Sequence, residues 1–289
     1  MMSDSKIIHL NGEFLPEDRA KVSVLDRGFL FGDGVYEVIP VFGGRPLRLG
    51  EHLDRLARSL AEIRIPDPLS REDWAILIDE LLARNPGGDR SVYVQVTRGV
   101  APRDHAFPEA IEPTVMAMVN PIRPPGEQVL TQGVAAVVIP DHRWSRCDIK
   151  AITLLANVLA RQEAVDSGAT EAILVRNGLA TEGAASNLFL VADGVIVTPP
   201  KDHSLLGGIT RDLLVELAEA NGLPVMETRI PEDSLQGAQE IWLTSSTREI
   251  LPVTRLDGRA VGEGVPGPVW RRVHALYQDY KASLRQEAP

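Results

Sequence analysis

One lysine of this chain lies where its amine could act as a nucleophile. Lys150 stands in the largely apolar stretch Cys147-Asp-Ile-Lys-Ala-Ile-Thr-Leu-Leu155, and the chain holds only five lysines among its 30 basic residues. Burial disfavours an ammonium ion, so it lowers the pKa and leaves an amine that can attack a carbonyl carbon. The alternative is a lysine at the start of a helix that extends its ammonium into water.

An isolated acidic residue is the second candidate. Glu182 lies in Thr181-Glu-Gly-Ala-Ala-Ser-Asn187, which we expect to connect two strands. A carboxylate that faces the interior there requires a cationic partner. The alternative is a glutamate at the end of a hairpin, in solvent.

Two segments could bind an anion such as phosphate. Gly207-Gly208-Ile209-Thr210-Arg211 opens a predicted helix, where free N–H groups and the helix dipole favour negative charge. Thr244-Ser245-Ser246-Thr247 places four hydroxyls after a short predicted strand. The alternatives are a flexible turn with Thr210 as N-cap, and hydroxyls that only satisfy the backbone of a turn.

Three basic residues complete the set. Arg103 and His105 lie in a polar, proline-containing loop between residues 99 and 112, where an arginine could grip a carboxylate through two hydrogen bonds. Arg55 lies off the leucine stripe of its predicted helix, so its simplest interpretation is a solvated arginine. Together these residues match what a pyridoxal phosphate site requires. Such a site needs a lysine that attacks the carbonyl carbon, an acid, groups that bind the phosphate and groups that bind the substrate carboxylate.

Regular elements must position these residues, and the pattern predicts an α/β or α+β protein. Asn11-Gly12 and Gly43-Gly44 indicate hairpin turns. Apolar spacing predicts helices over residues 51–64 and 70–84, with Ser70 and Asp73 as a capping box. Further strands are expected at the following ranges: 91–98, 114–119, 134–139, 172–176, 187–191, 195–198 and 240–244. Further helices are expected over 151–167, from Thr210 to about residue 220, and over 268–284.

Length and composition limit the architecture and the function classes. A chain of 289 residues is long enough for two domains. The segment Asn120-Pro-Ile-Arg-Pro-Pro-Gly126 is the predicted linker, between an N-terminal domain over 1–122 and a C-terminal domain over 127–289 that carries the lysine. A net charge of −10 argues against nucleic-acid binding. The single cysteine excludes a disulfide framework, and the six histidines lack ligand spacing, so we expect no metal.

No P-loop, HExxH, CxxC or GxSxG motif is present, and Glu37 stands where a dinucleotide fingerprint needs its third glycine. No run of about 18 apolar residues and no apolar leader is found, so we expect a cytoplasmic protein without membrane contact.

The chain resembles the fold-type IV, or class IV, pyridoxal-phosphate aminotransferases over nearly its whole length, and within them the D-amino acid transaminases. Seven stretches in the family's order carry the resemblance: Phe31-Gly-Asp-Gly-Val-Tyr-Glu37, Glu51-His-Leu-Asp-Arg-Leu56, Val96-Thr-Arg-Gly99 with Arg103-Asp-His105, Cys147-Asp-Ile-Lys150, Thr181-Glu-Gly183 with Ser186-Asn-Leu-Phe189, Gly208-Ile-Thr-Arg211, and Thr244-Ser-Ser-Thr247. The resemblance implies two α/β domains with pyridoxal 5'-phosphate between them.

The resemblance also implies a role for each candidate. Lys150 would form the Schiff base and then move the substrate proton, while Glu182 would keep the pyridine nitrogen protonated. The phosphate would be bound by Arg55, Ile209, Thr210 and Ser246, with Ser245 close by. Tyr36, Arg103 and His105 would bind the substrate carboxylate. The loop that carries Arg103 and His105 would reach into the active site of the other subunit of a homodimer.

We therefore expect transamination between a D-amino acid, such as D-alanine or D-glutamate, and a 2-oxo acid such as pyruvate or 2-oxoglutarate. Within the family, the alternatives are a branched-chain L-amino acid aminotransferase, an (R)-amine transaminase and an aminodeoxychorismate lyase. A non-catalytic binding protein is disfavoured, because both Lys150 and Glu182 are present. Pro40 and Arg248 depart from the family's pattern and put the substrate range in doubt.

Overall fold

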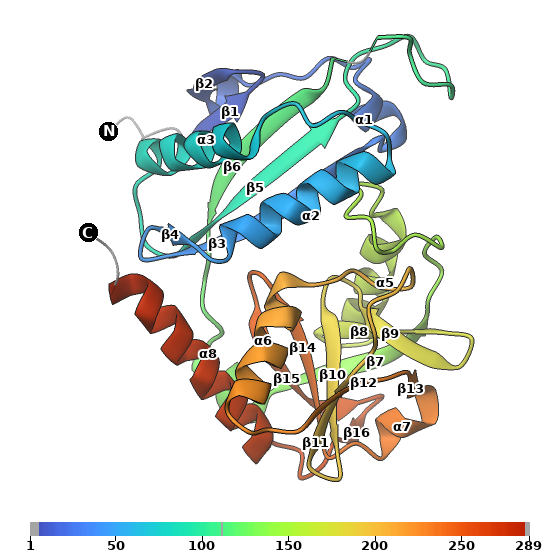
Figure 1. The fold of residues 1–289 in the computed structure, drawn as a ribbon. Helices are drawn as coiled ribbons and strands as arrows, with labels where there is room; N and C mark the ends of the chain where they lie inside the picture. Colours follow the sequence, from blue (N-terminus) through green and yellow to red (C-terminus); the bar gives the residue numbers. More distant parts are fainter. Residues whose placement is uncertain (1–5, 111, 287–289) are drawn as a thin grey trace. The chain divides into compact units, whose positions relative to one another are not determined.

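The structure is a computed structural model that describes residues 6–110 and 112–286, and its contacts divide the chain into two compact units (Figure 1). The first unit comprises the described residues up to Arg123, residues 149–153 and residues 284–286. The second comprises Pro124–Asp148 and Leu154–Ser283. The sequence expectation placed Lys150 in the C-terminal domain, whereas the structure groups residues 149–153 with the first unit.

The first unit is built on a six-stranded antiparallel sheet in the order β2-β1-β6-β5-β3-β4. Asn11 and Gly12 join the first two strands with φ values of 49° and 89°, which confirms the predicted hairpin turn. The strands of this sheet are β1 Ile7–Leu10, β2 Glu13–Pro16, β3 Gly34–Phe42, β4 Arg45–Pro46, β5 Arg90–Thr97 and β6 Thr114–Pro121.

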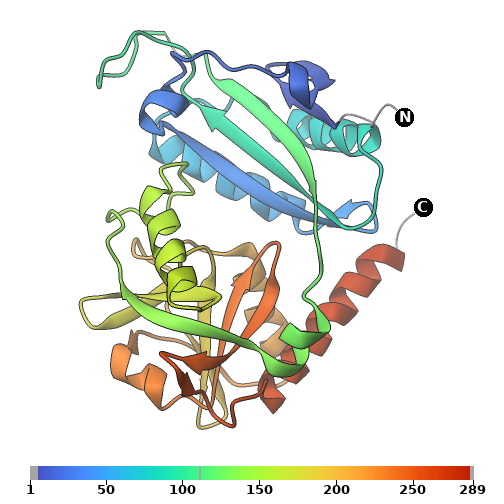
Figure 2. The ribbon, with the colours of Figure 1, turned by 180° about the vertical axis from the view of Figure 1, so that it is seen from behind.

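Two long helices, α2 (Leu49–Glu62) and α3 (Arg71–Arg84), cover one face of this sheet, as Figures 1 and 2 show from opposite sides. Their leucines pack with the valines of β3, β5 and β6 to form the core. Ser70 caps α3 by accepting the Asp73 N–H at 3.1 Å, and the Ser70 hydroxyl donates to the Asp73 carboxylate at 2.6 Å. The predicted capping pair is thereby confirmed. The short helices η1 (Glu17–Arg19) and α1 (Arg27–Phe31) precede β3.

Pro40 lies inside β3, although proline cannot donate to a strand ladder. Its carbonyl accepts the Leu47 N–H at 2.7 Å. In an antiparallel strand the N–H and C=O of one residue point to the same side. The position where Pro40 lacks an N–H is therefore on the side of Leu47 and short β4, not on the side of β5. Pro40 is therefore tolerated because β3 pairs with β4 only at Val41 and Phe42, so no ladder hydrogen bond from residue 40 is lost on that side.

The second unit holds a ten-stranded mixed sheet in the order β12-β11-β10-β14-β15-β7-β8-β9-β13, with β16 paired to β15. Its strands are β7 Val134–Pro140, β8 Glu171–Arg176, β9 Leu179–Gly183, β10 Asn187–Ala192, β11 Val195–Thr198, β12 Val225–Glu227, β13 Ile230–Pro231, β14 Glu240–Ser245, β15 Glu249–Leu256 and β16 Arg259–Ala260. Its helices are α4 Glu127–Gln132, α5 Leu155–Asp166, α6 Ile209–Ala220, α7 Glu232–Gln236 and α8 Pro268–Gln286, the last of which ends in residues grouped with the first unit.

Three features of the second unit differ from the sequence expectations. The helix expected from residue 151 begins at Leu155, because Ala151 forms a bridge with Val35 and its N–H donates to the Ile149 carbonyl at 2.8 Å. Glu182 lies within strand β9 rather than in a connection between strands. Strand β15 was not predicted at all. Among the described residues, no helix combines the length and apolarity needed to cross a bilayer.

Candidate active site

Lys150 is fixed against strand β3 through its backbone. The Tyr36 N–H donates to the Lys150 carbonyl at 3.0 Å, and the Lys150 N–H donates to Ser59 Oγ at 3.4 Å. The Lys150 Nζ lies 4.3 Å from the centroid of the Tyr36 ring. Lys150 thus lies in an irregular segment next to β3, not at the start of a helix, and this partly buried residue holds its amine over an aromatic ring.

Arg55 is buried, so it is not the solvated arginine that its place off the leucine stripe indicated. Its Nε and Nη2 donate to the two carboxylate oxygens of Glu37 at 2.7 and 2.8 Å, and His52 Nδ1 lies 2.8 Å from Glu37 Oε2. Burial alone would raise the pKa of Glu37, but the charge and hydrogen bonds of Arg55, with those of His52, hold that pKa well below its usual range. Burial lowers the pKa of His52, which is therefore neutral and donates through Nδ1.

Arg103 and His105 lie on an exposed loop and share one aromatic neighbour, Phe31. The Arg103 guanidinium carbon lies 5.3 Å from the Phe31 ring centroid, and the His105 ring centroid lies 5.4 Å from it. Arg27 holds the same loop, because its Nη1 donates to the Asp104 carbonyl at 2.5 Å. The Arg27 side chain is itself fixed by Asp33, which accepts from its Nε at 2.8 Å. The structure brings Arg103 and His105 together at the end of α1.

Glu182 has the cationic partner that an interior carboxylate requires. Arg143 Nη1 donates to Glu182 Oε1, while Oε2 accepts from Asn187 Nδ2 and from the Leu206 N–H, each at 3.2 Å. Burial raises the pKa of Glu182, opposed by the charge and hydrogen bond of Arg143 and by the Leu206 N–H. The interpretation of Glu182 as a solvated hairpin residue is wrong, since its side chain is buried within β9.

The sequence did not single out Arg143. Its guanidinium also donates to both oxygens of Asp141 at 2.9 Å, and these hydrogen bonds raise its pKa further against the effect of burial. The need of Glu182 for a cation was the only sequence signal, and it did not indicate which of 25 arginines would supply it.

The beginning of α6 is suited to an anion. Gly208 is the N-cap and gives no side-chain cap, so the N–H groups of Ile209 and Thr210 lie in the unsatisfied first turn. A Cβ on Gly208 would lie 1.9 Å from Asn187 Oδ1, which explains the glycine. The buried Thr210 Oγ1 and Thr244 Oγ1 find no hydrogen-bond partner among the described residues. These buried polar groups require an acceptor or donor from outside the protein.

The hydroxyl run begins in strand β14, which ends at Ser245, and continues into the turn between β14 and β15, which Ser246, Thr247 and Arg248 form. Ser245 Oγ accepts the Arg248 N–H at 3.3 Å, and Arg248 Nη1 donates to Glu171 Oε2 at 3.0 Å. Arg248 thus faces a buried carboxylate of β8. The following residue, Glu249, has a φ of 59° and is held by the buried Lys281. The pairing of Arg248 with Glu171 and of Lys281 with Glu249 therefore holds the chain next to Ser245 and Ser246 in place.

The sequence-predicted residues fall into two groups. The first unit holds Tyr36, Arg55, Arg103, His105 and Lys150. Within it the Lys150 amine lies over the Tyr36 ring. The second unit holds Glu182, Ile209, Thr210, Ser245 and Ser246, at the end of β9, the start of α6 and the β14–β15 turn. No described group of three or more His, Cys, Asp or Glu side chains is placed to hold a metal ion.

A family model described as amino-transferase class IV matches residues 34–256, a span that contains every one of these residues. The chain belongs to the class IV aminotransferases. This aminotransferase is 42% identical over 269 residues to the D-alanine aminotransferase of Bacillus licheniformis, an alignment that covers 93% of this chain and 95% of the relative.

Solved structures of class IV enzymes share the aminotransferase's fold. It superimposes on the branched-chain amino acid aminotransferase of Escherichia coli with a TM-score of 0.91 and 31% identity, over 95% of this chain and 94% of that one. It matches the T.th. branched-chain amino acid aminotransferase, solved with pyridoxamine 5'-phosphate, with a TM-score of 0.90 and 29% identity, over 99% and 96% of the two chains.

Proposed function

We propose that this aminotransferase moves the amino group of a D-amino acid, such as D-alanine or D-glutamate, to a 2-oxo acid such as pyruvate or 2-oxoglutarate, with pyridoxal 5'-phosphate as cofactor. The observation that carries the choice of substrate is the 42% identity to a D-alanine aminotransferase over nearly the full length of both chains. The similarity to the Escherichia coli branched-chain enzyme is 31% in sequence, although its fold is nearly the same.

The residues present fit pyridoxal phosphate. When bound, the cofactor supplies a carbonyl carbon that takes up the amino group and a ring that accepts electrons from the substrate Cα. The unpartnered Thr210 hydroxyl and the uncapped first turn of α6 are suited to its phosphate, with Ser245 and Ser246 as further donors. Arg55 would add positive charge, although two of its nitrogens are already bound to Glu37.

Lys150 and Glu182 would control two protons, the one on the substrate Cα and the one on the pyridine nitrogen. With the cofactor bound, the Lys150 amine would be the group that holds its carbonyl carbon and, when free, would take the proton from the substrate Cα. Glu182 would accept a hydrogen bond from the pyridine nitrogen and would hold the proton there. Because Arg143 and Asn187 fix both carboxylate oxygens, Glu182 is positioned before the cofactor arrives.

Tyr36, Arg103 and His105 would bind the substrate carboxylate. Arg103 and His105 are exposed on their loop, and Phe31 orients both. We propose that this loop serves the active site of the second subunit in a homodimer, as the resemblance implies. A guanidinium fork on such a loop suits a carboxylate through paired hydrogen bonds.

The visible spectrum of the enzyme loaded with pyridoxal phosphate tests this proposal. An absorbance band from the Lys150 Schiff base is expected to bleach when D-alanine is added, and to persist when a fresh sample receives L-leucine. Bleaching with L-leucine alone would move the protein to the branched-chain group. Bleaching with an (R)-amine that lacks a carboxylate would favour an amine transaminase, and the absence of any band would contradict the cofactor assignment.

A further inference from the structure

The clamp loop, residues 99–110 after β5, carries two of the three residues proposed to bind the substrate carboxylate. Its tip is exposed, since Arg103, Asp104, His105 and Ala106 all lie at the surface. Burial of apolar side chains therefore contributes little to the conformation of the tip. Other contacts must fix it if the two residues are to meet a carboxylate with a defined geometry.

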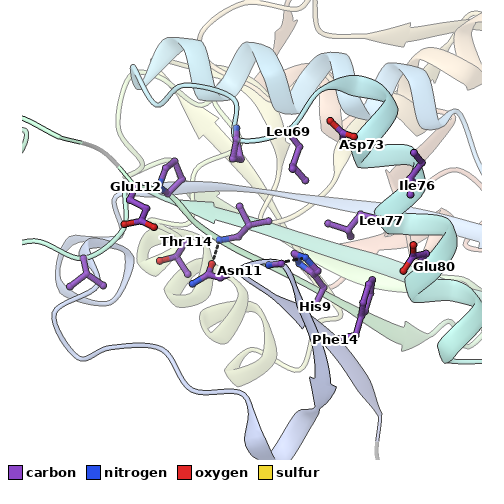
Figure 3. A pocket seen from close by; sticks show the side chains of 15 residues that line it. His9, Asn11, Phe14, Leu69, Asp73, Ile76, Leu77, Glu80, Glu112 and Thr114 are labelled. Atoms are coloured by element: carbon purple, nitrogen blue, oxygen red, sulfur yellow. Dashed lines mark hydrogen bonds between the residues drawn. The ribbon is translucent and has the colours of Figure 1, made fainter.

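The strands on either side of the clamp loop are joined by side chains from outside it. The carboxylate of Asp26, which is 1% exposed, accepts the hydroxyls of Thr97 at 3.0 Å and Thr114 at 2.7 Å, at the end of β5 and the start of β6. Next to Thr114, the Val115 N–H donates to Asn11 Oδ1 at 2.8 Å, in the turn of the first hairpin (Figure 3). These contacts fix where the chain leaves β5 and enters β6, but they do not reach the tip.

Arg27 reaches the tip from the beginning of α1. The residue is 3% exposed, and its backbone N–H donates to the Gly99 carbonyl at 2.9 Å. Its Nη1 donates to the Asp104 carbonyl at 2.5 Å and lies 3.3 Å from the Ala106 carbonyl oxygen, which it also contacts as a donor. Asp104 stands between the two loop residues proposed to bind the carboxylate, so Arg27 fixes the peptide that joins them.

The guanidinium of Arg27 is itself held in one orientation. Asp33 accepts from Arg27 Nε at 2.8 Å and from Nε and Nη2 of Arg98 at 2.8 and 2.9 Å. Arg98 also donates to the carbonyls of Ile63 and Arg64 at 2.7 and 3.1 Å, just after the end of α2. The contact on the tip is therefore tied through Asp33 to a helix that packs on the sheet.

Phe31, at the end of α1, contacts the side chains of the tip. Its ring centroid lies 4.8 Å from the guanidinium carbon of Arg27 and 5.3 Å from that of Arg103. The His105 ring centroid lies 5.4 Å from it. Helix α1 thus contacts both the backbone and the side chains of the tip.

We propose that Arg27 is a positioning residue for the substrate carboxylate. Through the carbonyls of Asp104 and Ala106 it holds Arg103 and His105 where they meet that carboxylate. The inference rests on the proposed function, because it concerns the same carboxylate. The amino acid and the 2-oxo acid each bring a carboxylate to this clamp, so loss of Arg27 weakens the binding of both. Loss of binding that is shared by ground and transition states raises KM more than it lowers kcat.

Steady-state kinetics of the Arg27→Met holoenzyme test this role. The KM values for D-alanine and for pyruvate should each rise by roughly tenfold, because a displaced clamp no longer fits the carboxylate. The kcat should change by less than about threefold. The variant should fold, since methionine fills much of the buried space and Asp33 keeps its two hydrogen bonds with Arg98.

Arg27→Lys is the second variant, and it keeps a positive charge beside Asp33. A single ammonium cannot reproduce the fork that binds Asp33 through Nε and the Asp104 carbonyl through Nη1. Both KM values should therefore rise in this variant as well, by about threefold or more. It serves as the test if Arg27→Met does not fold.

A double-mutant cycle with Arg103→Ala separates positioning from a general structural effect. If Arg27 acts by placing the clamp, Arg27→Met should raise KM by less than about threefold once Arg103 is absent. Leu81→Ala is the control for destabilisation, because Leu81 is buried in the core of the same unit on α3. It should lower the melting temperature and leave both KM values unchanged.

Hydrogen–deuterium exchange of the holoenzyme gives a measurement that needs no substrate. Peptides within the clamp loop should exchange about tenfold faster in Arg27→Met than in the parent, because the tip has lost its donor. Peptides from β5 and α3 should exchange at the parent rate.

The proposal is overturned if Arg27→Met keeps the parent KM for both substrates, or if Leu81→Ala raises KM as much. Full additivity of Arg27→Met and Arg103→Ala, or unchanged exchange of the clamp loop in Arg27→Met, would overturn it too. Failure of the parent enzyme to turn over D-alanine would instead contradict the proposed function. The exchange rates of the clamp loop would still decide whether Arg27 holds it, so the two failures are distinguishable.

Discussion

Arg143 donates a hydrogen bond from Nη1 to Oε1 of the buried Glu182, and its other nitrogens bind Asp141. Arg176 lies 3.0 Å from the second oxygen of Asp141, so two arginines balance two carboxylates in one cluster. The carboxylate proposed to hold the pyridine nitrogen is therefore part of a neutral, interlocked group. Removal of Arg143 would leave Glu182 buried without its cationic partner, while Asp141 would keep Arg176.

Arg143→Met should destabilise the protein strongly. Glu182 would lose its cationic partner while Asp141 would keep Arg176, and breaking a buried ion pair costs about 3–5 kcal/mol. Urea unfolding of the cofactor-free protein measures this loss. Arg146→Met is the control, because the Arg146–Asp148 pair is partly exposed and should contribute less than about 1 kcal/mol. Equal effects of the two substitutions would show that the Arg143 cluster is not structurally important.

Lys150→Ala should remove the Schiff-base absorbance and lower kcat by about 10³-fold or more, because no other group can replace the nucleophile. Stopped-flow absorbance and a coupled assay for the 2-oxo acid product measure both effects. Lys201→Ala removes an exposed lysine of the second unit and should leave activity unchanged. A Lys150→Ala protein with wild-type turnover would refute the assignment.

Arg103→Ala should lower kcat/KM for D-alanine by about 30-fold, which corresponds to about 2 kcal/mol, through loss of a charged hydrogen bond to the substrate carboxylate. Its unfolding free energy should stay the same, since the side chain is exposed. Arg58→Ala, an exposed arginine of α2, is the comparison for a change of surface charge. Unchanged activity of the Arg103 variant on D-alanine would show that the clamp is assigned to the wrong residue.

Glu37→Gln should change how stability depends on pH. Arg55 and His52 hold the pKa of Glu37 below its ordinary 4.5, so the ionised side chain stabilises the fold above pH 4.5 and loses that contribution as the pH falls further. The stability difference between parent and variant should thus be largest near pH 7, about 3 kcal/mol, and shrink at about pH 3.5. Urea titrations at both values measure it. Glu51 is exposed on helix α2, so the stability difference between the parent and Glu51→Gln should change little with pH. A stability difference for Glu37→Gln that stays constant between the two pH values would contradict the buried pairing.

The sequence predicted the regular elements best where local signals were strong. Apolar spacing and a capping box located α3, and Asn11-Gly12 located the first hairpin. Strand β15 was missed because Pro252 interrupts it, and a proline argues against an inner strand. Strand β9 is short and ends in glycine, so its alternation is too weak to recognise.

Candidate site residues could be chosen from the sequence, but their partners could not. Pairing of Arg55 with Glu37 joins α2 to β3, and pairing of Arg143 with Glu182 spans 39 positions. Such contacts depend on strand order and register, which periodicity does not encode.

Residues 149–153 complete the first unit from a position far along the chain: the Tyr36 N–H meets the Lys150 carbonyl, and the Ile152 N–H donates to the Gly34 carbonyl at 3.1 Å. During synthesis, the ribosome must therefore produce strand β3 about a hundred residues before its neighbour exists. A nascent chain that ends at Arg123 lacks these partners and the bridge between Ala151 and Val35. The lysine proposed to hold the cofactor is thus set in place late, by a segment that arrives at a sheet already made.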